Sequence, residues 1–320
     1  MSLLKRITPS NLLEEKEKFF ADQTYNPQFR YEDSFTSEEL HEYGLHDPSL
    51  LDQAQHILKE AFSQHTEEEI EAHEGPEISQ EVVSDKIMQF LKMHDLETQY
   101  HIQFSNSFIA RTSVNADTVK IRLPVRYRQN DLIGMIYHEL GTHALRRYNY
   151  EQQPFYKKKK KYGFGSYLVT EEGLAVLHSL LAFKFKLAYR PARYYVASGL
   201  AQELSFAETF AQLSTIFTDP EKRWTAVLRQ KRGLTDTSQP GGFTKDLVYF
   251  KGLVEITQWL TKNNYNLAAL YLGKIAKEDT QKAKLLNPNY KPLLPSFYVA
   301  NPEAYVEQVQ EIGKVNYVLS

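Results

Sequence analysis

The spacing of hydrophobic and polar positions changes twice along this chain of 320 residues. Up to about residue 94, apolar positions recur every three or four residues, which predicts three helices. Ser10 stands where the first should begin, and Asp47-Pro48 opens the second. The acidic stretch 66–81, interrupted by Gly75-Pro76, is expected to be an exposed linker. These helices are predicted over 10–20, 48–62 and 80–94.

The middle of the chain alternates with a period near two instead, which predicts short strands over Gln99–Phe104, Ser107–Thr112 and Thr118–Leu123. From residue 165 the helical period returns without any internal repeat. Further helices are therefore predicted over 170–187, 191–217, 221–231, 244–261, 265–275 and 301–316. The sum is a mostly α, α+β fold with helical N- and C-terminal parts.

The helix after the last strand carries His138-Glu139-Leu140-Gly141-Thr142-His143. Imidazole and carboxylate are the usual ligands of a catalytic zinc ion, and a further carboxylate can act as general base. In the common zincin motif the two imidazoles are four residues apart, about 40° around a helix. Here they are five apart, or about 140°. The spacing therefore predicts a bulge in the helix, which Gly141 would ease.

The same stretch has the marks of an ordinary helix, with Asn130 or Asp131 as its cap and Arg146-Arg147 in a later turn. A helix with two incidental histidines is the alternative to a metal site. Gly141 and the polar motif on an otherwise apolar helix weigh against that alternative, because each has a free-energy cost.

A catalytic zinc ion takes three protein ligands, so the third must come from elsewhere. Glu171-Glu172 lie at the start of a predicted helix that Thr170 would cap. Taken alone, the pair would have an ordinary explanation, because acidic residues in the first turn of a helix stabilise it through the helix dipole. Beside HExxxH we expect Glu172 to bind the ion and Glu171 to orient a ligating histidine. His178 is a rival ligand, although it lies about two turns away.

Composition narrows the class of protein. The chain contains no cysteine, so His and carboxylate are the available ligands, and manganese or cobalt could replace zinc. With a net charge of −2, the chain lacks the overall positive charge that is typical of proteins that bind nucleic acids. With no long apolar run, we expect no membrane span and no signal peptide, which fits a cytoplasmic protein.

The order of elements places a zincin-like helix directly after a small sheet. Residues 1–95 are expected to form a helical N-terminal subdomain packed on a metallopeptidase domain over 96–320. The strand Thr118–Leu123 could pair with a substrate backbone by β-augmentation, or it could be an internal strand that only packs.

His138–His143, Arg146, Tyr148-Asn149, Gln153-Pro154 and Glu171–Ala175 together resemble the microtubule-associated tyrosine carboxypeptidase (MATCAP) family and its bacterial relatives. Bacterial relatives usually have Gln in place of Glu171, whereas the animal pattern is closer to this chain. The resemblance covers most of the chain from about residue 21. Supporting segments are Asn26–Tyr31, Lys231–Leu234, Gly242–Asp246 and Tyr249–Gly252.

The resemblance implies a metallocarboxypeptidase with one Zn²⁺ that removes a C-terminal aromatic residue. Tubulin tyrosine is the substrate of the animal members. Carried onto this sequence, His138, His143 and Glu172 would be the metal ligands and Glu139 the catalytic base. The partner would be the C-terminal tail of a peptide or protein, with acidic, tubulin-like tails as one candidate.

An exopeptidase must also hold the terminal carboxylate of its substrate, for which Arg and Lys are suited. The basic, glycine-containing segment 229–245 is the first candidate, although it could simply be a basic helix end. Arg146 and Arg147 are secondary candidates, and Tyr194 could donate to the oxyanion. With 21 Tyr and 18 Phe in the chain, core packing remains the alternative for each aromatic. The residues expected to bind substrate are Arg193, Lys231, Arg232, Lys245 and Tyr249.

Five consecutive lysines, Lys157–Lys161, separate the two metal-binding segments. Such a run is usually a solvated loop, but it could also guide an acidic tail toward the site. Two other functions remain open. One is a zinc hydrolase of the aminopeptidase or dipeptidyl-peptidase type, and the other is a non-catalytic zinc protein that binds acidic tails.

Overall fold

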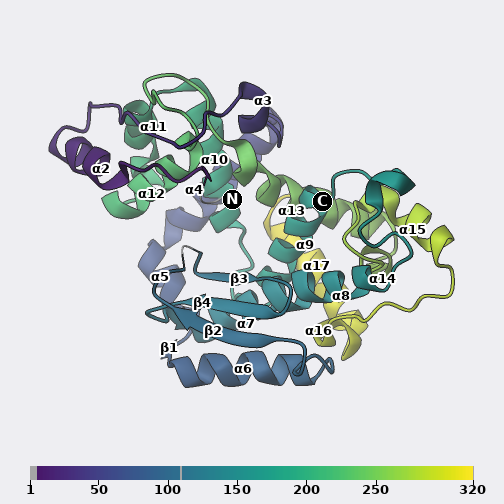
Figure 1. Cartoon of the computed structure of the whole chain (residues 1–320). Coiled ribbons are helices and arrows are strands. Elements are labelled where there is room, and N and C mark those ends of the chain that lie inside the picture. The colour runs from purple at the N-terminus through teal and green to yellow at the C-terminus, as the bar shows by residue number, and fades with distance from the viewer. Residues whose placement is uncertain (1–5, 109, 320) are drawn as a thin grey trace. The chain divides into compact units, whose positions relative to one another are not determined.

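A computed structural model describes residues 6–108 and 110–319 (Figure 1). These residues form two compact units, each built from two stretches of the chain. The first unit comprises residues 6–61 and 188–250, and the second comprises 62–187 and 251–319. The predicted division into a subdomain over 1–95 and a metallopeptidase domain over 96–320 stays a prediction.

The first unit is helical, and an aromatic cluster fills its interior. Phe19 is fully buried, with its ring centroid 4.8 Å from that of Phe210 and 5.1 Å from those of Phe206 and Trp224. Edge-on and tilted aromatic pairs of this kind add to the free energy gained by burial. The helices are α2 (Leu12–Ala21), α3 (Ser37–Leu40), α4 (Pro48–Gln64), α10 (Tyr189–Glu203), α11 (Phe206–Gln212), α12 (Pro220–Lys231) and α13 (Leu247–Lys262), with short 3₁₀ turns at Leu213–Thr215 and Thr244–Asp246. Helices α4 and α13 continue into the second unit.

The second unit holds two small sheets. In the larger, β4 (Thr118–Arg122) lies between β2 (His101–Ser105) and β3 (Thr112–Val114). Strand β2 is parallel to β4 and β3 is antiparallel to it, with His101 opposite Thr118 and Thr112 opposite Ile121. The smaller sheet pairs β1 (Glu77–Ile78) with β5 (Tyr127–Arg128). In Figure 1 the larger sheet lies beside α6 (Gln80–Lys92) and α7 (Gln129–His138).

The described part of the second unit contains further helices. They are α5 (Glu67–Ala72), α8 (Leu145–Glu151), α9 (Leu168–Leu180), α14 (Leu267–Leu270), α15 (Thr280–Leu286), α16 (Ser296–Val299) and α17 (Pro302–Val315), with 3₁₀ turns at Lys159–Tyr162 and Lys277–Asp279. Within the described residues, none of these or the other helices is both long enough and apolar enough to cross a bilayer. The predicted α+β, mostly α class is confirmed.

Several local predictions were wrong, and each has a physical reason. The supposed acidic linker contains α5, because Thr66 and Glu69 form a capping box in which each side chain accepts the other's backbone N–H. Glu67 and Glu74 are buried rather than exposed. The helix predicted over 191–217 is interrupted at Leu204, where Ser205 starts a new helix with a second capping box.

Three other boundaries also moved. The predicted helix over 265–275 shrinks to α14, and the strand predicted at Ser107–Thr112 begins only at Thr112. Ile109, inside that prediction, lies outside the described residues. Ser10 does not cap α2, since its hydroxyl donates to the Arg30 carbonyl at 3.2 Å. Strand β4 has a partner on both sides, so the hypothesis that it pairs with a substrate backbone is contradicted.

Candidate metal centre

The predicted bulge in the motif helix is present. Helix α7 ends at His138, a π-helical turn occupies Glu139–Ala144, and α8 continues from Leu145. The wider turn adds one residue and lets two imidazoles five positions apart point the same way. The predicted cap was wrong, because α7 begins at Gln129 with Arg128 as its N-cap residue.

Side chains from outside the motif stabilise the π-turn. The Tyr271 hydroxyl donates to the Gly141 carbonyl at 2.5 Å, and Thr142 donates to the Tyr137 carbonyl at 3.0 Å. A Cβ on Gly141 would lie 2.8 Å from the Phe297 ring, so glycine permits a close contact here as well as the distortion. These bonds satisfy carbonyls that a regular helix would have paired.

The π-turn brings three potential metal ligands together. Glu172 Oε2 is 3.8 Å from His138 Nε2 and 3.6 Å from His143 Nε2, and the ligand atoms of all three lie within 4.8 Å of one another. Both Glu172–imidazole separations are short enough for the two atoms to bind one ion with bonds of about 2.0–2.2 Å. The side chains of His138, His143 and Glu172 keep 22%, 16% and 12% of their surface exposed, so a fourth position can remain accessible. This His₂Glu donor set suits a catalytic divalent ion.

Glu171 lies behind one of these imidazoles. Its Oε1 atom is 2.9 Å from His143 Nδ1, which leaves Nε2 directed toward Glu172. The same oxygen is 2.8 Å from Lys274 Nζ, and the other carboxylate oxygen accepts from Arg146. These cations hold the pKa of Glu171 well below its usual range although burial opposes the charge. A permanent carboxylate at this place fixes the ring and tautomer of His143.

Arg146 is completely buried and serves the architecture. Its guanidinium donates to Glu171 and to the carbonyls of Leu270 at 2.9 Å and Ile275 at 2.7 Å. It therefore ties the motif helix to α9 and to the segment after α14. The hypothesis that Arg146 holds a substrate carboxylate is contradicted, because the side chain is fully buried and binds Glu171 and two backbone carbonyls.

The glycine after the acidic pair has a steric role. A Cβ on Gly173 would lie 2.1 Å from the carbonyl carbon of Gly252 on α13, so two glycines allow the helices to approach closely. Thr170 does not cap this helix, which begins at Leu168. The Thr170 hydroxyl instead accepts the backbone N–H of Lys277 at 3.0 Å.

His178 stays outside the metal group. It is fully buried, with Nδ1 2.8 Å from the Thr142 hydroxyl and Nε2 3.1 Å from the Tyr305 hydroxyl. Burial lowers the pKa of His178 to about 3, so the ring is neutral. Both nitrogens are engaged in hydrogen bonds, which leaves neither for an ion.

Glu139 lies between the two histidines in the sequence but does not belong to the three-ligand group. Burial raises the pKa of Glu139 to about 7, while the charge of His143 opposes this shift. Glu172 raises it further, and Lys274 lowers it. A carboxylate with a pKa near neutrality can both accept and return a proton.

The ionisation of the imidazoles predicts a proton count for metal binding. Burial opposes the charge of His143, but Glu172 and Glu171 outweigh it and raise its pKa to about 10. Burial and then the charge of His143 lower the pKa of His138 to about 4. Below its raised pKa His143 is protonated, so at pH 7 it must lose a proton to bind an ion, whereas His138 is already neutral.

We therefore expect zinc uptake by the metal-free protein at pH 7 to release about one proton per ion or slightly more. Isothermal titration in buffers of different ionisation enthalpy measures this number. The Glu171→Gln variant is the control, because losing one carboxylate lowers the pKa of His143 and reduces the release. Binding without proton release would show that His143 is not the charged ligand.

The residues predicted to bind substrate all lie in the first unit. Lys231 is fully buried, and its ammonium group donates to the carbonyls of Ala201 at 2.9 Å, Leu204 at 2.5 Å and Gln239 at 2.9 Å. Backbone carbonyls of the first unit thus accept the hydrogen bonds of this ammonium group. Arg193 is also mostly buried, with its guanidinium carbon 4.7 Å from the Phe217 ring centroid. The roles of Arg193, Arg232, Lys245 and Tyr249 stay predictions.

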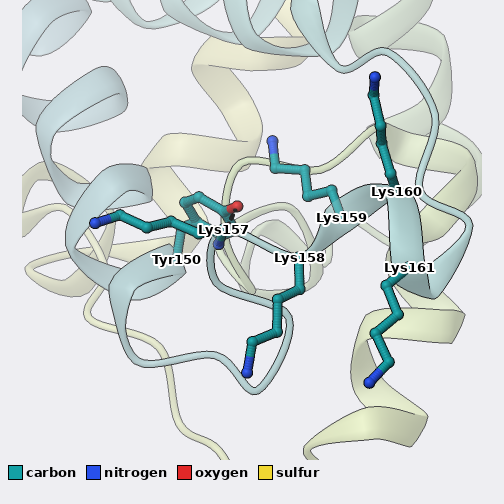
Figure 2. Close-up of a pocket in the computed structure, with 6 residues that line it drawn as sticks. All are labelled: Tyr150, Lys157, Lys158, Lys159, Lys160 and Lys161. Carbon is teal, nitrogen blue, oxygen red and sulfur yellow. Dashed lines mark hydrogen bonds between the residues drawn. The ribbon is translucent and has the colours of Figure 1, made fainter.

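The lysine run belongs to the second unit, with the metal group. Lys157–Lys161 and Tyr150 line a cavity of about 510 Å³. Figure 2 shows that the five side chains leave the loop in different directions, so the cavity is bordered largely by their aliphatic stems. Four of them are exposed, and Lys159 is half-buried.

The site combines a π-turn at HExxxH with a His₂Glu ligand group and one further glutamate, Glu139. These are the features of a metallopeptidase. Residues 10–299 match the family model described as microtubule-associated tyrosine carboxypeptidase. The chain is 30% identical over 322 residues to microtubule-associated tyrosine carboxypeptidase 1 of Mus musculus and 32% identical to that of Homo sapiens. Each alignment covers 98% of this chain and 68% of the relative. The chain belongs to the MATCAP family, as its motifs predicted.

Proposed function

We propose that this protein is a zinc carboxypeptidase that removes a C-terminal Tyr or Phe from peptide or protein tails. The observation that carries the proposal is the His138, His143 and Glu172 group beside Glu139 on the π-turn. Family membership supplies the reaction class, and the names of the relatives link it to tyrosine. A cytoplasmic setting is part of the proposal, since those names also refer to microtubules.

In the proposed mechanism His138, His143 and Glu172 hold one Zn²⁺. Such an ion, when bound, polarises the scissile carbonyl and acidifies water. Glu139 accepts the proton of the attacking water and delivers it to the departing amine, for which a pKa near neutrality is suited. Glu171 keeps His143 in the tautomer with its proton on Nδ1. The partly exposed face of the three ligands is where the peptide would enter.

Peptides that differ only at the C-terminus test this function. An acidic tail ending in Tyr, Phe or Ala, and the same tail with its C-terminus blocked, are incubated with the protein and weighed by mass spectrometry. We expect loss of a single terminal Tyr or Phe, little loss of Ala and none from the blocked peptide. Loss of two N-terminal residues would indicate a dipeptidyl peptidase instead, and tight binding without cleavage would indicate a non-catalytic binder.

We further propose that the natural substrate has an acidic, tubulin-like tail. The lysine run supports this, because its four exposed ammonium groups are in the same unit as the metal group. Long-range attraction of this kind raises the rate of encounter and is screened by salt.

Replacing Lys157, Lys158, Lys160 and Lys161 with Ser is expected to raise KM for an acidic tail about 3- to 10-fold at low ionic strength. The difference should nearly vanish at about 0.5 M salt, where the screening length is only a few ångströms. Steady-state kinetics on an acidic and a neutral tail, each ending in Tyr, measures the effect. A loss that is equal for both tails, or independent of salt, would contradict electrostatic guidance.

A further inference from the structure

Lys274 lies next to the metal group, although no pattern in the sequence pointed to it. Its ammonium group shares the Oε1 atom of Glu171 with His143 Nδ1, at 2.8 Å and 2.9 Å respectively. Its charge also acts on Glu139. One carboxylate oxygen therefore separates Lys274 from a candidate metal ligand.

Lys274 also reaches the surface, while its partner does not. The side chain of Lys274 is 22% exposed and that of Glu171 is 3% exposed. Arg146, which is fully buried, already neutralises Glu171 through the other carboxylate oxygen. The ammonium group of Lys274 can thus bind an incoming anion while Arg146 still neutralises the buried carboxylate of Glu171.

The segment that carries Lys274 is held rigidly. Arg146 binds the carbonyls of Leu270 and Ile275 on either side of it. Gly273 has a φ of +136°, and a Cβ there would lie 3.2 Å from Cα of Tyr150. A binding cation on a fixed segment loses little conformational freedom when a ligand arrives.

Lys159 adds a second positive charge to the same region. Its ammonium group is 3.4 Å from the Tyr167 ring centroid and 4.7 Å from that of Tyr150. Its charge interacts with those of Glu171, Arg146 and Lys274. Among the described residues, no ion pair to a carboxylate involves Lys159, whereas Lys277 is paired with Glu255 at 2.8 Å.

Arg146 and Lys274 therefore contact the carboxylate of Glu171, and the charge of Lys159 acts on it as well. The surplus positive charge lies beside the candidate metal group and in the same unit. In a carboxypeptidase the terminal carboxylate is one residue beyond the cleaved bond, a reach of at most about 3.6 Å along the chain. A cation that holds it must therefore lie close to the metal ligands, and Lys274 meets this requirement.

On the basis of the proposed function, we propose that Lys274, with Lys159 as a second cation, binds the free terminal carboxylate of the substrate. This assigns the selection of chain ends to the second unit. It also gives Lys159, the middle residue of the lysine run, a role that differs from attraction of an acidic tail. Lys245 and Arg232 are the rival predictions from the sequence.

The decisive comparison is between a free and an amidated C-terminus. Peptides ending in Tyr with a carboxylate or a primary amide are tested with the wild type and with Lys274→Met. We expect the variant to lose about 10- to 100-fold in kcat/KM on the free acid, the range for a charge-assisted hydrogen bond. The amide, which the wild type is not expected to cleave, is compared by binding. Lys274→Arg should recover much of the loss. Lys159→Met should show a smaller loss of the same kind.

Binding provides a second readout that does not depend on turnover. In the Glu139→Gln background, Lys274→Met should weaken binding of the free-acid peptide and leave the amide unaffected, with metal content unchanged. Lys262→Met removes an exposed lysine at the end of α13 and serves as the control for net charge. Thermal melting shows whether each variant is folded.

Three outcomes would overturn the assignment. Equal losses in binding of the acid and the amide, or a fall in metal affinity, would mean that Lys274 acts only by positioning Glu171. A preference for the free acid that survives in Lys274→Met but disappears in Lys245→Met would place the carboxylate site in the first unit. If the wild type removes no C-terminal residue from either peptide, the proposed function itself fails, and the assignment with it.

Discussion

Replacing Glu139 with Gln is expected to lower kcat by about 10²–10⁴-fold while the protein keeps its metal. The amide has nearly the shape of the carboxylate but cannot accept the proton of the attacking water. Glu139 does not belong to the group formed by His138, His143 and Glu172, so its loss should not empty the site. Steady-state kinetics together with metal analysis of dialysed protein measures both effects.

The control for this experiment is Glu151→Gln on α8. Glu151 is exposed, and its carboxylate is 2.9 Å from Arg147 Nε. That variant should keep wild-type turnover. Glu139→Gln cleaving at the wild-type rate would show that another group is the base. Loss of metal in Glu139→Gln would show instead that Glu139 is a ligand.

Replacing Glu172 with Ala is expected to produce the largest loss of metal affinity. It removes one of three ligands and leaves His138 and His143 facing each other without the carboxylate between them. The loss should exceed the roughly 10- to 100-fold that is typical when a group behind a ligand is removed. Glu171→Gln is the matched comparison, because it removes such a group one residue away. Competition with a chelator gives both affinities.

A Glu172→Ala variant that keeps zinc through dialysis would contradict this assignment. The third ligand would then have to be Glu171, freed from Arg146 and Lys274, or His178, freed from Thr142 and Tyr305. Both alternatives require buried hydrogen bonds to break. An unchanged affinity would therefore also show that the buried hydrogen bonds of α9 rearrange when metal binds.

The centre of the site could be predicted from the sequence because its geometry is local. Five-residue spacing between His138 and His143 cannot serve one ion on a regular helix, so the spacing itself predicts the π-turn. Glu171-Glu172 could be found because a catalytic ion needs a third ligand. In each case a chemical requirement and a short stretch of chain were sufficient.

The support of the site could not be predicted, because it is assembled across more than a hundred residues of sequence. Arg146 binds the carbonyls of Leu270 and Ile275, and Tyr271 binds that of Gly141. Nothing in the local pattern around Lys274 distinguishes it from the other lysines of the chain. Its relation to Glu171 exists only in the folded chain.

Errors in the fold have similar causes, with one exception. The order of strands in a sheet is a tertiary property, so the central place of β4 could not be derived from its alternation. The exception is α5, where Thr66 and Glu69 have the spacing of a capping box. The local signal was present there, but the acidic composition outweighed it in the prediction.

The central claim is that one metal ion at His138, His143 and Glu172 drives cleavage of a C-terminal aromatic residue. The most direct test titrates zinc into metal-free protein and follows, by mass, the loss of Tyr from an acidic peptide with a free C-terminus. We predict no cleavage without metal, and activity that rises with zinc and saturates at one ion per chain. Full activity in metal-free protein, or cleavage at any other bond, would contradict the account.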